Sequence, residues 1–320
     1  MNGKAAKWLA RRIGGSLLLA FLVVTIVFFT LHLVPGDPAV LLLSTGGAAP
    51  SQEQVMRLRD KLGLDRPLIE QYWTFLSGIV QGDLGKSLQD DYPVASEIAL
   101  RLPRTLELIF AAVIIGLAVG FPSGVKAAFG HGGWFDRIAS GTAALLMAIP
   151  VFVVGTLLVL AFAVQLRWMP AGGFTPFSQD PVKHLTLLTL PALAIAKGLA
   201  ATVFRMTKAS VLDVMTRDHV RTARAKGLTP RRITMRHVVR NALSPVVTVV
   251  GLQIGTLLGG TVLVEYVFNW PGLSSPLIKA VEGRDYPMVA GIVLTISGLF
   301  LLINLIMDLL YAVLDPRVRP

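Results

Sequence analysis

Six long apolar stretches constrain this chain more than any other feature of its sequence. A helix needs about 20 apolar residues to cross a bilayer, whereas a transmembrane strand alternates in polarity. These stretches do not alternate, and a mean hydropathy of +0.65 is too high for an ordinary soluble domain. We therefore predict an all-α membrane protein with six transmembrane helices, at about Ile13–Leu33, Leu106–Val125, Ile138–Leu166, Leu185–Phe204, Pro245–Val264 and Val289–Leu310.

The fourth stretch is interrupted by Lys197, and Pro191 removes one of its backbone donors. Loop charges argue that it nevertheless spans the membrane. The segment 205–244 carries ten Lys/Arg and two Asp, whereas 167–184 and 267–287 carry two Lys/Arg each. Because basic residues concentrate in cytoplasmic loops, six spans with both termini in the cytoplasm are favoured.

The basic N-terminus before the first stretch resembles that of a signal peptide. The apolar run is too long for a signal sequence, and no small-residue cleavage site follows it, so we interpret it as a retained span. The chain then divides into residues 1–34 (N-terminus and first span), a long extracytoplasmic loop at 35–103, and a core domain at 104–320 that contains the other five spans and the cytoplasmic loop 205–244.

Apolar spacing predicts three short helices outside the spans. Two of them, Gln52–Leu62 and Pro67–Val80, are expected to lie on the outer face of the membrane, and Leu273–Val281 follows the fifth span. Glycines every fourth residue, as in membrane helices that pack closely, predict packing faces whose partners the sequence does not identify, at Gly116, Gly120, Gly124, Gly251, Gly255 and Gly259.

Several chemical functions lack the residues they need. The net charge of +11 is explained by membrane topology better than by nucleic acid. Gly85-Lys86-Ser87 resembles the end of a nucleotide-binding loop, but Val80 stands where that loop needs glycine. There are no cysteines, and the five histidines lack ligand spacing. We expect no enzymatic activity and no cofactor or metal bound by this chain.

The cytoplasmic loop 205–244 carries a predicted helix–break–helix unit. Lys208–Met215 continues the fourth span, and Thr216 or Asp218 is placed to cap a short helix that ends at Gly227, where glycine suits a left-handed backbone. Thr229 is expected to cap the next helix, with Pro230 at its first position.

This short helix has features of a docking site. Small Ala223 and Gly227 would leave a shallow face for a neighbour, and Arg221, Arg224 and Lys226 would pair with acidic groups on it. The alternative is a basic loop that only fixes topology and touches lipid headgroups.

The segment Asp218-His219-Val220-Arg221-Thr222-Ala223-Arg224-Ala225-Lys226-Gly227 resembles the EAA loop of bacterial ABC-importer permeases. It is closest to the Asp-Tyr-x-Arg-Thr-Ala-x-Ala-Lys-Gly version in dipeptide, oligopeptide and nickel permeases, with His219 in place of the usual Tyr. Further matches to the family lie at 33–38, 62–67, 82–85, 265–273, 284–287 and 308–317.

The resemblance implies one permease subunit of an ATP-driven importer in the bacterial inner membrane. Its partners would be a homologous second permease, two ATP-binding subunits that hold ATP and Mg, and an extracytoplasmic solute-binding protein. Coupling to the ATPases would use Arg221, Thr222, Ala223, Arg224, Ala225, Lys226 and Gly227. The family carries peptides and related small solutes, opines and nickel complexes, among which the sequence does not choose.

Polar positions within the spans are candidates for the translocation path, namely Gln253, Thr256, Glu265 and Asn304. Glu265 has an alternative role as an interface carboxylate bonded to a nearby loop, and Lys197 either lines the cavity or pairs with a neighbouring chain. Candidate contacts of the binding protein are Pro271, Gly272, Leu273, Arg284 and Asp285.

Two other classes of protein were weighed. A stand-alone secondary transporter or channel usually shows inverted repeats and broken helices with ion sites, and neither is evident in the sequence. A membrane enzyme needs a catalytic cluster, and we find none.

Overall fold

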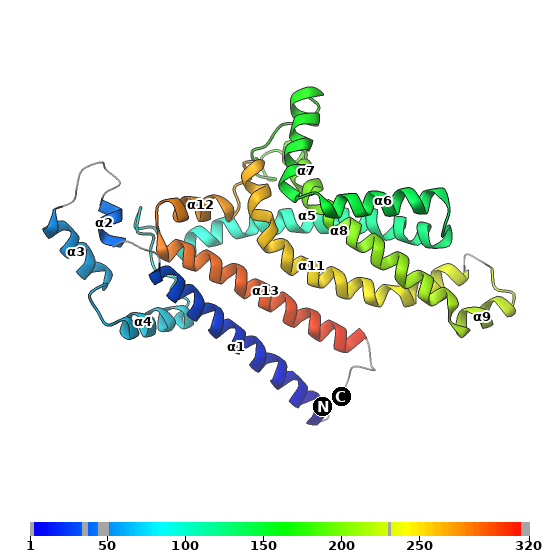
Figure 1. The fold of residues 1–320 in the computed structure, drawn as a ribbon, viewed down its shortest axis with the longest axis horizontal. Coiled ribbons are helices and arrows are strands. Elements are labelled where there is room, and N and C mark those ends of the chain that lie inside the picture. The colour runs from blue at the N-terminus through cyan, green and yellow to red at the C-terminus, as the bar shows by residue number, and fades with distance from the viewer. Residues whose placement is uncertain (1–2, 34–37, 44–50, 230–231, 315–320) are drawn as a thin grey trace. The chain divides into compact units, whose positions relative to one another are not determined.

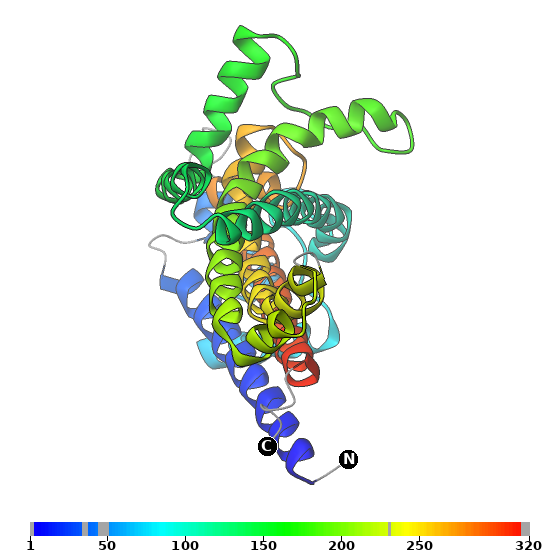
Figure 2. The ribbon, with the colours of Figure 1, turned by 90° about the vertical axis from the view of Figure 1, so that its right-hand side faces the viewer.

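The computed structural model describes residues 3–33, 38–43, 51–229 and 232–314, and these are largely helical (Figures 1 and 2). Within them, strand pairing is limited to an isolated bridge between Lys86 and Pro93. The helices are α1 (Gly3–Leu33), α2 (Pro38–Leu43), α3 (Gln52–Leu62), α4 (Leu68–Gln81), α5 (Val94–Phe129), α6 (Trp134–Ala148), α7 (Val151–Leu158), η2 (Val159–Gln165), α8 (Pro181–Thr216), α9 (Asp218–Ala225), η3 (Ile233–Val239), α11 (Arg240–Val267), α12 (Ser274–Glu282) and α13 (Tyr286–Leu314).

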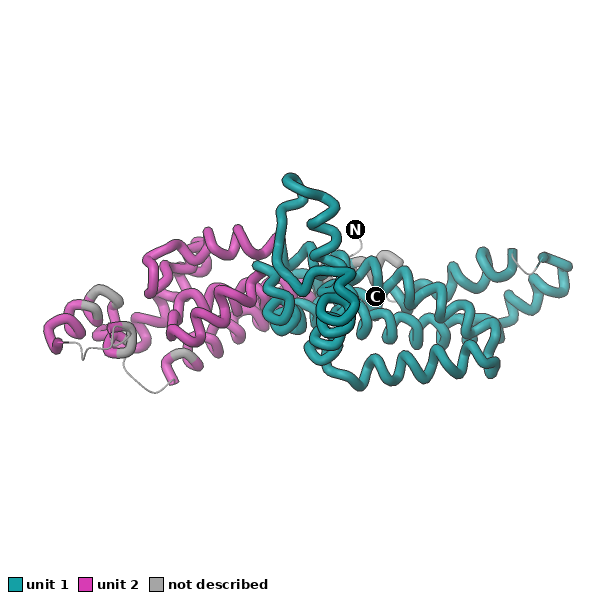
Figure 3. The backbone as a smooth tube through the Cα atoms, turned by 90° about the horizontal axis from the view of Figure 1, so that it is seen from above, with its two compact units in different colours: residues 1–8, 104–271, 302–320 teal, residues 9–103, 272–301 magenta. Residues whose placement is uncertain are grey.

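The chain forms two compact units, each assembled from distant parts of the sequence (Figure 3). Unit 1 contains residues 1–8, 104–271 and 302–320, and unit 2 contains 9–103 and 272–301. The three segments predicted from topology describe the path through the membrane rather than this packing, and they stay a prediction.

The all-helical membrane fold is confirmed. Among the described residues, five candidate spans are long and apolar enough to cross a bilayer, at Ala10–Thr30, Val94–Phe129, Pro181–Thr216, Ile233–Val267 and Tyr286–Met307. The fourth predicted span lies within α8, which stays helical through Pro191. A sixth span is present only if α6 and the following α7–η2 segment are counted together.

The predicted third span, Ile138–Leu166, is broken in the structure, because its two parts are bent by 105° at the break around Pro150. Proline has no N–H to donate and disfavours helical backbone in the residue before it, and Ile149 is extended. The carbonyls freed at the end of α6 are satisfied by Lys197, whose Nζ donates to Leu146 O at 2.7 Å and also to Ile149 O. Lys197 therefore stabilises a helix break within its own chain.

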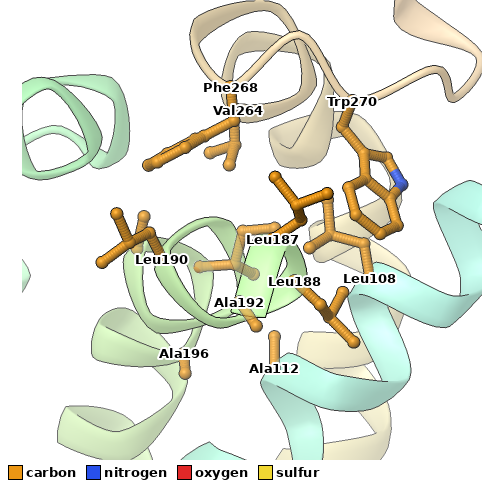
Figure 4. Packing of buried hydrophobic residues seen from close by; sticks show 12 residues of the cluster. Leu108, Ala112, Leu187, Leu188, Leu190, Ala192, Ala196, Val264, Phe268 and Trp270 are labelled. Carbon is orange, nitrogen blue, oxygen red and sulfur yellow. The ribbon is translucent and has the colours of Figure 1, made fainter. Parts of the chain in front are cut away.

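Helix α8 is the centre of unit 1. Two of its leucines, Leu187 and Leu190, are buried with Leu108 of α5 and with Phe268 and Trp270, which follow α11 (Figure 4). The indole Nε1 of Trp270 donates to a backbone carbonyl of α5, that of Arg104, at 3.0 Å.

One predicted glycine stripe packs against α8. A Cβ at Gly116 would lie 2.8 Å from Leu199, and one at Gly120 would lie 2.5 Å from the carbonyl oxygen of Ala200. Gly124 approaches Phe204 O and Thr207 as closely. Only glycine allows this approach of two helix backbones, so the stripe Gly116–Gly120–Gly124 is confirmed as a packing face.

The second stripe is not a continuous packing face within the chain. A Cβ at Gly251 would clash with Met307 of α13, but one at Gly259 would meet no atom within 4 Å. Gly259 therefore lies open on α11.

Unit 2 contains all three short helices that the sequence predicted. Helix α3 begins with a capping box between Ser51 and Gln54 and ends at Gly63 in left-handed conformation. Helices α4 and α12 lie within one residue of the predicted bounds. The residues Val94, Ile98, Leu273, Ala280, Met288 and Ile292 form a buried cluster of this unit.

Candidate functional site

The predicted coupling helix is α9, which follows the end of α8 after a single non-helical residue (Figure 1). The expected cap by Thr216 is wrong, because its hydroxyl donates to Asp213 O and the N-cap position belongs to Arg217. Asp218 instead lies in the first turn, where a carboxylate is favoured by the helix dipole.

The C-terminal end of α9 agrees with the sequence. Gly227 has φ +72°, and its N–H donates to Arg224 O at 2.9 Å. The N–H of Leu228 reaches back to Ala223 O at 3.3 Å, which completes a glycine-terminated helix end. Thr229 O accepts from Ile233 N, so a helical segment does follow, and Pro230 lies outside the described residues.

The inner face of α9 is packed against its own chain. Val220 is fully buried and Ala223 is 4% exposed, in a cluster with Val211 and Val214 of α8 and Val238 of η3. The prediction that Ala223 offers a shallow face to a neighbour is therefore wrong. A small residue is needed there because the side chain points into unit 1.

The outer face of α9 is exposed and basic. Arg221, Thr222, Arg224, Ala225 and Lys226 are all exposed, as is Gly227 beyond the helix. Arg221 has a side chain 73% exposed and lies 3.8 Å from Asp218. Charged side chains held this way on a packed helix are available to acidic groups of another protein.

A buried ionic cluster, which sequence reasoning missed, joins the turn between α5 and α6 to α8. Asp136 is 4% exposed, pairs with Lys208 of α8, and accepts from Gly132 N at 3.0 Å and Ser140 Oγ at 3.1 Å. Nδ1 of His131 lies 3.0 Å from the same carboxylate. Asp136 is the lone acid in the basic segment 126–137, which is the signal that could have indicated it.

Of the candidate path residues, Glu265 is not exposed to a cavity. It is 1% exposed, and the Thr105 hydroxyl of α5 donates to it at 2.6 Å. Glu265 is thus bonded within the chain, as the alternative role expected, but its partner Thr105 lies on helix α5 and not on the nearby loop. This geometry corrects the assignment of Glu265 to the path.

The other three path candidates are accessible. Gln253 is half-buried and donates to Thr202 of α8 at 3.4 Å, and Thr256 is exposed one turn later on α11. Asn304 of α13 is half-buried. The Thr256 hydroxyl lies 3.4 Å from Gln253 Oε1, but no hydrogen bond joins Asn304 to either of them in the described part of the chain.

Three of the predicted contacts of the binding protein are buried. Leu273 is 1% exposed and Asp285 is 2% exposed, and Gly272 is also buried, whereas Pro271 and Arg284 are half-buried. The predictions for Gly272, Leu273 and Asp285 are wrong as direct contacts, because these residues build unit 2.

Asp285 organises the loop before α5. It accepts from Ser87 Oγ at 2.6 Å and from Leu88 N at 3.1 Å. The Gly85-Lys86-Ser87 sequence thus has a structural role, since its serine holds a carboxylate almost 200 residues away in sequence.

Comparisons with known proteins agree with this architecture. Residues 99–320 match the family model of the binding-protein-dependent transport system inner membrane component, and residues 5–109 match the N-terminal model of such membrane components. The glutathione transport system permease protein GsiC of Pectobacterium atrosepticum is 43% identical over 313 residues, 97% of each chain. GsiC of Escherichia coli is 40% identical over 312 residues, 98% of each chain.

Two solved structures share the fold. An inward-facing MetNI methionine ABC transporter matches with a TM-score of 0.55 and 20% identity, covering 68% of this chain and 96% of that one. An amino acid ABC transporter crystallised with histidines matches with a TM-score of 0.50 and 19% identity, covering 76% of this chain and 98% of that one.

Proposed function

This chain belongs to the family of binding-protein-dependent transport system inner membrane components and is a permease subunit of an ABC importer, and we propose that α9 is the element on which a separate ATPase acts. The observation that carries the proposal is the division of α9 into two faces. Val220 and Ala223 are packed into unit 1, while Arg221, Thr222 and Arg224 are exposed. A loop that only fixed topology would not need the packed inner face.

The packing of α9 supports a route for the transmitted force. A displacement of α9 acts on the end of α8, and α8 contacts α5 through the glycine stripe and contains buried leucines of the unit 1 core. Packed helices move as bodies between discrete arrangements. Closure of an ATPase dimer on ATP would therefore shift the population of inward-open and outward-open states.

The proposed assembly contains a homologous second permease, two ATP-binding subunits that hold ATP and Mg²⁺, and an extracytoplasmic solute-binding protein. This chain is a multi-pass protein of the bacterial inner membrane and is not itself an ATPase. A stand-alone transporter or channel is not favoured, because the matched family is defined by its dependence on a binding protein. We retain Gln253, Thr256 and Asn304 as proposed path residues.

The docking proposal is tested by cross-linking in the complete transporter. The chain has no cysteine, so Thr222→Cys introduces a unique thiol on the exposed face of α9. We expect a cysteine-to-amine cross-linker to join this thiol to an ATPase subunit, detected by mass spectrometry. The matched control is Arg57→Cys in α3, an exposed helical position predicted on the other side of the membrane. The proposal is wrong if Thr222→Cys yields no ATPase adduct or if Arg57→Cys yields an equal one.

We further propose that the solute is a small peptide or a glutathione-like molecule, supported by the name of the full-length relatives. In proteoliposomes that contain the complete transporter and its binding protein, we expect ATP-dependent uptake of labelled glutathione or of a dipeptide. Excess unlabelled solute of the same class should abolish the uptake, whereas an unrelated sugar should not. If neither solute is taken up by a transporter whose ATPase activity still responds to the binding protein, the proposed solute class is wrong. The proposed role of α9 is not affected by that result.

A further inference from the structure

Helix α4 in the extracytoplasmic loop carries an apolar stripe that the rest of its unit leaves exposed. The stripe contains four residues at intervals of four, three and four, which places them on one side of the helix: Ile69, Trp73, Leu76 and Val80. Ile69 is 61% exposed, Trp73 59% and Val80 82%, while Leu76 between them is half-buried. A continuous apolar stripe of this kind on a protein surface marks a contact with a partner or a membrane.

A neighbouring apolar face of α4 packs against α1. Tyr72 is buried, and its hydroxyl lies 2.8 Å from Thr25 Oγ1. Because Thr25 donates its proton to Phe21 O, the Tyr72 hydroxyl is the donor of this bond. The ring of Phe28, itself buried, lies 5.3 Å from that of Tyr72 and 5.5 Å from that of Phe75.

The opposite side of α4 is polar. Glu70, Thr74, Ser77 and Gln81 repeat with the same four-three-four spacing and are exposed. The helix therefore has an apolar half, made of the stripe and the face against α1, and a polar half. This distribution is typical of a helix that lies in the interface of a bilayer.

The contacts with α1 also fix the depth of α4. Thr25 and Phe28 lie within Ala10–Thr30, the part of α1 that is apolar enough to cross the membrane. Thr25 is five residues before the end of that part, a distance of about 8 Å along a helix axis. A helix whose tyrosine bonds to Thr25 is therefore held close to the apolar part of α1, at the level of the membrane surface.

We propose that α4 is embedded in the outer leaflet, with Ile69, Trp73, Leu76 and Val80 against lipid acyl chains and its polar side toward the headgroups and water. Lipid is the occupant because α1, the apolar helix on which α4 packs, also exposes large apolar side chains, at Leu22, Ile26 and Phe29. Tryptophan is enriched at this level of a bilayer. The helix then anchors the loop to the membrane instead of lying on its outer face, as the sequence alone predicted.

The test uses the full chain reconstituted in lipid nanodiscs, without other subunits. Single cysteines are placed on the stripe by Ile69→Cys and Val80→Cys, and on the polar side of the same helix by Glu70→Cys and Ser77→Cys. Each carries a nitroxide label whose collisions with oxygen and with a water-soluble nickel chelate are measured by electron paramagnetic resonance. We expect the ratio of oxygen to nickel collisions to be severalfold higher at the two stripe positions than at the two polar positions.

Equal ratios on the two sides of α4 would overturn the proposal. The proposal would also be overturned if the nickel chelate reached the stripe labels freely and was excluded only after the solute-binding protein was added. The stripe would then be a protein-docking surface. Because all four positions are exposed, loss of folding is not an expected consequence of the substitutions. A thermal unfolding midpoint equal to that of the unsubstituted chain is required of each labelled variant before its ratio is compared.

Discussion

Reversing two charges on α9, by Arg221→Glu together with Arg224→Glu, is expected to lower ATP-dependent uptake at least about tenfold while the chain still inserts into the membrane. A tenfold change corresponds to about 1.4 kcal/mol, and like charges placed opposite each other in an interface cost several kcal/mol. Both side chains are exposed, so the substitution leaves the packed residues Val220 and Ala223 untouched. Uptake into proteoliposomes and copurification of the ATPase subunits measure the effect.

The control is Arg57→Glu in α3, which reverses a single arginine on another exposed helix and is compared with each single reversal, Arg221→Glu and Arg224→Glu, as well as with the double one. The side chain of Arg57 is 78% exposed and pairs only with exposed Glu53 among the described residues. Exposed pairs of this kind contribute about 0–1 kcal/mol, so uptake should stay close to that of the parent. Normal uptake by the doubly reversed variant would refute a role of the basic face in docking and leave it as a determinant of topology.

Local signals in the sequence were sufficient to predict α9 and the short helices α3, α4 and α12. The left-handed Gly227 and the helix Gln52–Leu62 are both where the sequence predicted them. Such features depend on hydrogen bonds between residues within a few positions, so composition and spacing describe them well.

Features that depend on distant contacts were not predictable in the same way. The side of α9 that turns inward is decided by Val211 and Val238, which lie before and after it in the chain. The role of Lys197 at the break before Pro150 needs a helix about 50 residues away. The buried bond between Ser87 and Asp285 joins residues almost 200 positions apart. In each case the residue type was visible in the sequence, but its partner was not.

Removing the buried carboxylate by Asp136→Ala is expected to destabilise the chain far more than any exposed ion pair does. Asp136 is 4% exposed, and its partner Lys208 has a side chain only 20% exposed. The substitution leaves the ammonium group of Lys208 largely buried, with Ser140 Oγ, at 3.1 Å, as its remaining partner among the described residues. A charge buried without its counter-ion is costly, because it has lost its hydration without compensation.

The control for this variant is Asp213→Ala, which removes the carboxylate of the exposed pair with Arg217 on the same helix as Lys208. The side chains of that pair are 62% and 56% exposed. Breaking a buried ion pair costs more than breaking an exposed one. We therefore expect the loss of unfolding free energy caused by Asp136→Ala to be at least roughly three times the loss caused by Asp213→Ala. Thermal and denaturant unfolding of the two variants in detergent micelles, followed by circular dichroism, measure the two losses.

A double variant separates the ion pair from the local hydrogen bonds of Asp136. If the unpaired charge is the cause, adding Lys208→Met to Asp136→Ala should recover part of the lost stability, since no buried charge is then left alone. The bonds from Gly132 N and Ser140 Oγ to Asp136 stay lost in both variants, so recovery is expected to be incomplete. Two results would contradict this role of the cluster. One is an equal loss of unfolding free energy for Asp136→Ala and Asp213→Ala, and the other is a double variant less stable than Asp136→Ala.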